Sequence, residues 1–67
     1  MVTGEREGWL SRELRRLSHL EWNICLMWRG EEWECILTRP ASGPDLGLGA
    51  GTTASKALRD ATREAGL

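Results

Sequence analysis

The sequence predicts a small α+β domain with the element order α-β-β-(β)-α, in which two helices cover one face of an antiparallel sheet. Two observations carry this prediction. Residues 22–37 alternate apolar and other side chains with a period of two, as a half-buried hairpin does. Residues 9–20 and 53–65 instead repeat apolar side chains at the spacing of amphipathic helices. The 67 residues are expected to form a single domain, 1–67.

The first predicted helix follows a polar segment, residues 1–8, which we expect to be a flexible terminus. Ser11 is a candidate N-cap, because its hydroxyl can accept a hydrogen bond from a backbone N–H of the first turn. An earlier start near Thr3 is the alternative. The apolar stripe of this helix consists of Leu10, Leu14, Leu17 and Leu20.

Gly30 and Glu31 are predicted to form the two-residue turn of the hairpin, with Gly in the first position as a type II′ turn requires. Paired residues then add up to 61, so that Trp28 faces Trp33 and Arg29 faces Glu32. A slip of one residue would move the apolar residues to the other face. In the predicted register, one face carries Trp22, Ile24, Leu26, Trp28, Trp33, Cys35 and Leu37.

Tryptophan is the only aromatic residue type in the chain, with four copies. Three of them, Trp22, Trp28 and Trp33, fall on that face of the hairpin. A Trp side chain can bury roughly 150–250 Å² of surface. We therefore expect these residues to supply the core against which the helices pack, without a disulfide or a metal.

The segment after the hairpin is rich in Gly and Pro, which favours a loop. Within it, leucines and an alanine alternate with glycines, so a short third strand over about 45–50 is the alternative. Gly47–Thr53 precedes a helix, but its spacing differs from that of a phosphate-binding loop, so we expect a tight turn and a helix cap there.

The last predicted helix begins at a Thr52 or Thr53 cap and runs to about Ala65, where Gly66 stops it. Its apolar stripe consists mainly of small side chains. Such a stripe would let the helix lie close to a sheet.

No combination of residues predicts catalysis. The single histidine, His19, lies near the end of the first helix, where a cation interacts favourably with the helix end. Cys25 and Cys35 fall on opposite faces of the hairpin, so they should form neither a disulfide nor a metal site. We therefore expect no enzyme, no cofactor and no metal.

The charge is nearly balanced, with 9 basic and 10 acidic side chains and a net charge of −1. This balance disfavours a nucleic-acid binder, for which a basic domain is expected. No secretory signal or apolar run of transmembrane length is visible, so we expect a cytoplasmic protein with reduced thiols and no membrane partner.

The sheet face opposite the tryptophans is the candidate binding surface. Its centre is apolar and its rim is charged, which is typical of a protein interface or a homodimer contact. The acidic turn beside it would suit a basic partner. The candidate partner-binding residues are Cys25, Met27, Glu31, Glu32, Glu34 and Ile36.

A second candidate surface is basic. Lys56, Arg59 and Arg63 recur at helical spacing on the last helix and could neutralise phosphates. Acidic residues stand among them, so a solvated face with ion pairs between residues such as Lys56 and Asp60 is the favoured interpretation.

One stretch of the chain and the element order over nearly its whole length resemble known families. The segment GTTASKALRDA, residues 51–61, resembles the helix entry of HicB-type antitoxin domains. The element order resembles a double-stranded-RNA-binding domain. Ala54, Ser55 and Leu58 stand where that family carries lysines, so its phosphate contacts are missing.

In size, charge and lack of catalytic groups, the chain is similar to the small phage inhibitors called anti-CRISPR proteins. This resemblance implies a module that docks on a nucleic-acid-handling complex and blocks it. We therefore expect a non-enzymatic protein-binding module that acts as a phage or mobile-element inhibitor of this kind. A small nucleic-acid-binding domain and a HicB-like antitoxin or structural homodimer are the alternatives.

Overall fold

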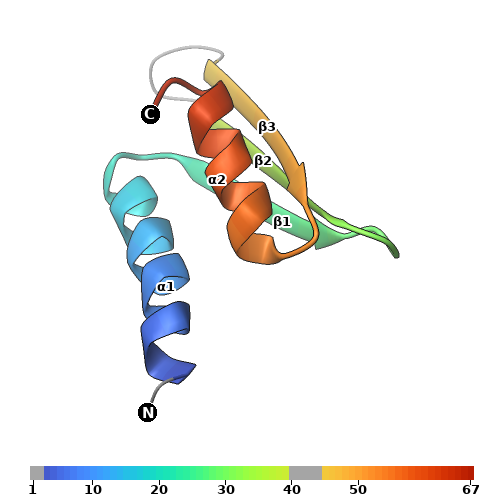
Figure 1. Ribbon diagram of the computed structural model, residues 1–67. Helices are drawn as coiled ribbons and strands as arrows, with labels where there is room; N and C mark the ends of the chain where they lie inside the picture. The colour runs from blue at the N-terminus through green and yellow to red at the C-terminus, as the bar shows by residue number, and fades with distance from the viewer. Residues whose placement is uncertain (1–2, 40–44) are drawn as a thin grey trace.

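The computed structural model describes residues 3–39 and 45–67, and it confirms the predicted fold class. Three antiparallel strands form one sheet in the order β1-β2-β3, with α2 lying across one face and α1 beside it (Figure 1). The elements are α1 (Thr3–His19), β1 (Asn23–Trp28), β2 (Trp33–Arg39), β3 (Asp45–Gly51) and α2 (Ala54–Glu64).

The hairpin of β1 and β2 has the predicted register throughout, from Asn23 opposite Thr38 to Trp28 opposite Trp33. Gly30 has a φ of 94°, and Glu31 has no positive φ, which is the pattern of a type II′ turn. The Arg29 amide donates to the Glu32 carbonyl at 2.9 Å and closes the turn. The glycine at the turn and the apolar alternation therefore specify one pairing.

The third strand is present, and it is longer than the alternative that the sequence left open. β3 pairs with β2 from Asp45, opposite Arg39, to Gly51, opposite Trp33. The prediction of a loop is therefore wrong for residues 45–51, including the expected tight turn at Gly47. Residues 40–44 of that predicted loop lie outside the described residues.

α2 packs directly on the glycines of β3, because its own contact residues are alanines. A Cβ atom placed on Gly47 would lie 2.8 Å from the Ala65 Cβ. A Cβ atom on Gly49 would overlap the backbone of Ala57 and Ala61. Atoms cannot approach so closely, so glycine is required at these positions for the helix to reach the sheet.

Both ends of α2 are capped as predicted. The Thr53 hydroxyl accepts a hydrogen bond from the Lys56 amide at 3.1 Å, so Thr53 rather than Thr52 is the N-cap. Gly66 follows the helix with a φ of 81°. Its amide donates to the Arg63 carbonyl at 3.1 Å, which is one of the bonds of a Schellman ending.

α1 begins at Thr3, so the expected flexible terminus is helical from that residue onward. Ser11 lies inside the helix and is exposed, and its prediction as the N-cap is wrong. Residues 3–8 contain no large apolar side chain, so the sequence has no periodic apolar signal there.

α1 ends in a Schellman motif that uses a glutamate instead of a glycine. Glu21 has a φ of 69°, the left-handed conformation that favours glycine. The Glu21 amide donates to the Ser18 carbonyl at 3.0 Å, and the Trp22 amide donates to the Leu17 carbonyl at 2.9 Å. This sharp stop sends the chain directly into β1.

The core contains fewer tryptophan rings than the sequence suggested. Trp22 is buried and Trp33 is half-buried, but Trp28 remains 55% exposed although it lies on the expected face. Trp28 ends β1 beside the turn, whereas α2 covers β2 and β3; its ring packs on Trp33 at 5.7 Å between centroids. The buried core consists of Leu17, Trp22, Cys35, Leu37, Ala57, Leu58 and Ala61.

Replacing glycine with alanine should have opposite effects on stability at Gly49, where α2 contacts β3, and at Gly8 in α1. Gly49→Ala should lower the free energy of unfolding by roughly 1–3 kcal/mol, because the new methyl group meets helix backbone. The methyl group of Gly8→Ala in α1 would meet only the end of the Arg12 side chain. This substitution should raise the free energy of unfolding by about 0.5–1 kcal/mol. Urea unfolding measures both changes, and equal effects would contradict the close packing.

The strained end of α1 predicts a stabilising substitution. Glu21→Gly should raise the free energy of unfolding by about 0.5–1 kcal/mol, because the left-handed strain exceeds the entropy that glycine adds to the unfolded chain. Ser18→Gly, in the last full turn of the same helix, is the control and should lower the free energy of unfolding by a similar amount. Thermal unfolding of both variants checks the prediction; a destabilised Glu21→Gly variant would refute it.

Candidate protein-binding face

The outer face of the sheet is the face opposite α2. The registers of β1, β2 and β3 determine its composition, because alternate residues of each strand point to the same side. α2 occupies the other side (Figure 1), where the glycines of β3 lie. The outer face carries Asn23, Cys25, Met27, Glu34, Ile36, Thr38, Leu46, Leu48 and Ala50.

The structure brings the three apolar candidates together at the centre of this face. Ile36 lies directly opposite Cys25, and Met27 is the next outward residue of β1. Cys25 is exposed, and Met27 and Ile36 are half-buried, so all three contribute surface.

β3 enlarges the apolar part of the outer face beyond the prediction. Leu48 lies opposite Ile36, and Leu46 lies opposite Thr38. Leu46 is 53% exposed and Leu48 is 51% exposed. Leu46 and Leu48 were absent from the predicted binding surface because the neighbouring glycines favoured a loop, although the alternation of leucine with glycine was a signal of a strand.

Two shallow clefts border the apolar centre, and carboxylates line both. The first, about 330 Å³, runs along β3 and reaches α2. Its lining residues are Glu34, Ile36, Leu48, Gly49, Ala50 and Asp60. The second, about 410 Å³, lies at the turn and is lined by Arg29, Glu31, Glu32, Glu34 and Thr52.

The acidic candidates therefore lie together, and Glu34 joins the two clefts. The Arg29 Nη1 atom lies 3.1 Å from the Glu34 Oε1 atom, so this cation already has a partner. Glu31 and Glu32 are exposed beside it. An arriving basic side chain would meet three carboxylates and one paired guanidinium at this end of the sheet.

The basic candidates of α2 are exposed, but one of them is engaged within the fold. The Arg59 guanidinium lies 4.8 Å from the centre of the Trp9 ring, in a cation–π contact that joins α2 to α1. Lys56 and Asp60 do not form the expected ion pair; an Asp60 oxygen instead accepts a hydrogen bond from the Ala50 amide at 3.2 Å.

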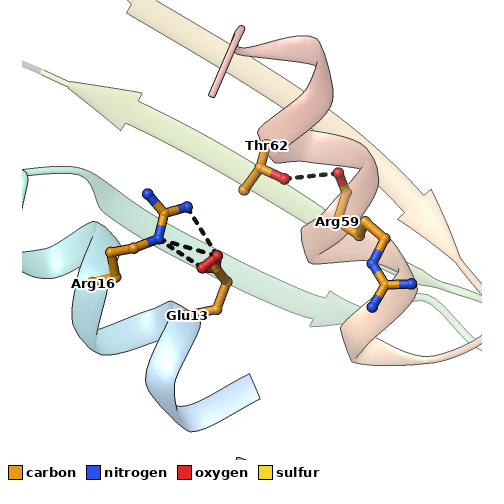
Figure 2. A network of polar contacts seen from close by, with 4 residues as sticks. All are labelled: Glu13, Arg16, Arg59 and Thr62. Carbon is orange, nitrogen blue, oxygen red and sulfur yellow. Dashed lines mark hydrogen bonds and ion pairs between the residues drawn. The ribbon is translucent and has the colours of Figure 1, made fainter. Parts of the chain in front are cut away.

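A further cation, Arg16, is paired within α1. Figure 2 shows the Arg16–Glu13 pair within α1 and, within α2, the Thr62 hydroxyl donating to the Arg59 carbonyl. The Arg16 Nε atom donates to a Glu13 oxygen at 2.8 Å, and this hydrogen bond lowers the pKa of Glu13. Arg59 therefore contributes to the contact of α2 with α1, and Arg16 is paired within α1, so both leave less free positive charge for phosphates.

The two cysteines are free thiols in different surroundings. Cys25 is exposed on the outer face, and Cys35 is buried in the core. Burial raises the pKa of the Cys35 thiol to about 11, and the nearby Cys25 adds to this rise. Cys35 therefore stays protonated near neutral pH and is a poor nucleophile.

In the described part of the chain, no group of three or more His, Cys, Asp or Glu side chains could hold a metal ion. Neither described helix combines the length and apolar character needed to cross a membrane. Comparisons with protein-family models, curated proteins and solved structures found no match to this chain.

The cysteine environments predict one fast and one slow thiol. At pH 8, Ellman's reagent should modify Cys25 at the rate of an exposed thiol, while Cys35 should react only as fast as the domain opens. A Cys25→Ser variant should lose the fast phase, and urea should restore full reaction of Cys35. Two thiols with equal rates in the native protein would contradict the buried position of Cys35.

Proposed function

We propose that this protein is a non-enzymatic binding module that docks its outer face on a basic, nucleic-acid-handling protein and blocks it. The observation that carries the proposal is the combination of exposed apolar side chains with carboxylates around two clefts. Apolar burial supplies affinity, and the acidic rim supplies selectivity for a basic surface. A role as an inhibitor encoded by a phage or mobile element fits the small size and near-neutral net charge.

The positions of the charges favour this function over direct nucleic-acid binding. Arg59 is engaged with Trp9, and Arg16 is paired with Glu13. Glu31 and Glu32 would repel phosphates at the turn. The same carboxylates could occupy the positions of phosphates in a partner's basic groove.

The test is affinity capture from bacterial lysate with matched charge variants. Ile36→Glu and Met27→Glu place a charge at the apolar centre of the outer face. Each should reduce recovery of the partner by roughly tenfold or more, as expected for the centre of an interface. Ser11→Glu adds the same charge on an exposed position of α1 and should leave recovery unchanged.

Nuclease treatment of the lysate separates a protein partner from bridging nucleic acid. Circular dichroism must show that all three variants remain folded. Partner recovery that survives nuclease and disappears with Ile36→Glu supports the proposal. Recovery that is unaffected by both outer-face variants would refute it.

A further inference from the structure

β3 is an edge strand of the sheet, paired on one side with β2. Edge strands expose N–H and C=O groups that can pair with another strand, and proteins protect them with charges, prolines or bulges. Residues 46–51 contain no charged residue and no proline, and their register with β2 is unbroken. Within residues 46–49, the edge therefore carries none of the charges, prolines or bulges that usually protect one.

The hydrogen-bond phase shows which residues face the open edge. In an antiparallel sheet, the backbone N–H and C=O groups of one residue point to the strand on one side, and those of the next residue point to the other side. The closing bond between Arg29 and Glu32 directs the even-numbered residues of β2 to β1 and the odd-numbered residues to β3. Gly47 and Gly49, which face odd-numbered residues of β2, therefore bond to β2. The N–H and C=O groups that point to the open edge belong to Leu46, Leu48 and Ala50.

The contact between Ala50 and Asp60 supports this phase independently. The Ala50 amide donates to the Asp60 carboxylate at 3.2 Å, so it points away from β2. Asp60 comes from α2 and occupies this one position of the edge. The amide of Leu48, two residues earlier, points to the same side.

The same residues of β3 therefore offer both unpaired backbone groups and exposed apolar side chains. Leu46 and Leu48 direct their backbone groups to the open edge and their half-exposed side chains to the outer face. The cleft along β3 adds Glu34 on the outer face and Asp60 from the helix side. A strand that pairs here would meet apolar surface on one side and a carboxylate on the other.

We propose that β3 accepts an extended segment of a basic partner as a fourth, antiparallel strand. This inference deepens the proposed function and rests on it. The segment would alternate apolar side chains, which extend the outer face beside Leu48, with basic side chains, which approach Asp60. A basic side chain would pair with Asp60, and a carbonyl of the segment would accept the Ala50 amide in its place.

A second copy of this chain fits the edge less well. Pairing β3 with itself around a two-fold axis would bring two Asp60 carboxylates to one short edge, where like charges repel. The Gly-rich inner row of β3 is already filled by α2. A basic segment instead neutralises Asp60, so charge complementarity favours a different chain.

The test uses two synthetic heptapeptides of alternating valine with lysine or with glutamate, labelled for fluorescence anisotropy. The lysine peptide should bind at least roughly tenfold more tightly than the glutamate peptide, with the difference shrinking as salt increases. In the proposed antiparallel pairing, the valines lie beside Leu48 and direct their amides to β3. N-methylation of the valines should therefore abolish binding, and N-methylation of the lysines should not.

The matched protein variants are Leu48→Pro and Leu48→Ala. Proline removes an amide that points to the open edge, so the β2–β3 ladder stays intact and circular dichroism should remain native. Leu48→Pro should weaken binding of the lysine peptide roughly tenfold or more, and Leu48→Ala clearly less. Equal binding of the two methylated peptides, or equal binding by the two variants, would overturn the strand pairing.

Two further outcomes separate this inference from the proposed function. If Leu48→Pro captures the cellular partner as wild type does while Ile36→Glu loses it, the outer face binds and the fourth strand is refuted. If neither peptide binds and sedimentation shows a dimer that Leu48→Pro dissociates, the edge belongs to a second copy and the basic partner is refuted.

Discussion

α2 lies so close to β3 that no side chain fits between them at Gly47 and Gly49. The helix contributes alanines to this contact, and the strand contributes bare backbone. Small side chains on both elements bring two long backbone segments within van der Waals distance, where many weak dispersion contacts add up. The contact also orients α2 so that Leu58 enters the buried core, to which Leu37 of β2 belongs. A domain of this size has few other ways to bury a helix.

The same glycines divide β3 into two rows with different tasks. The glycine row bonds to β2 and receives α2. The other row, with Leu46 and Leu48, has nowhere to place its side chains except the outer face, because the strand alternates. The exposed apolar surface is thus a consequence of how the helix is packed. A residue with a side chain at Gly49 would push α2 away and loosen both the core and the face that it supports.

The distribution of charges gives the outer face an acidic rim. Several arginines are already engaged by other residues of the domain. Arg16 pairs with Glu13, the Arg39 guanidinium lies 5.4 Å from the centre of the Trp22 ring, and the Arg59 guanidinium lies over the Trp9 ring. Among the residues that line the cleft at the turn, Arg29 is the one arginine, and it is already paired with Glu34. The near-neutral total therefore conceals an acidic rim next to the apolar face, and a basic protein surface is the partner that such a rim favours.

The sequence by itself determined the local structure where one residue type has a single physical meaning. Gly30 set the turn and therefore the register, and Thr53 and Gly66 set the ends of α2. It also placed Cys25, Met27 and Ile36 on one face and the glutamates at its rim. Only the tertiary structure decided the third strand. Glycines in a sequence favour a loop, and the reason for them here is the close contact of α2 with the backbone of β3. Packing likewise left Trp28 exposed and put Leu46 and Leu48 on the outer face, since which surface a helix covers depends on contacts far apart in the chain.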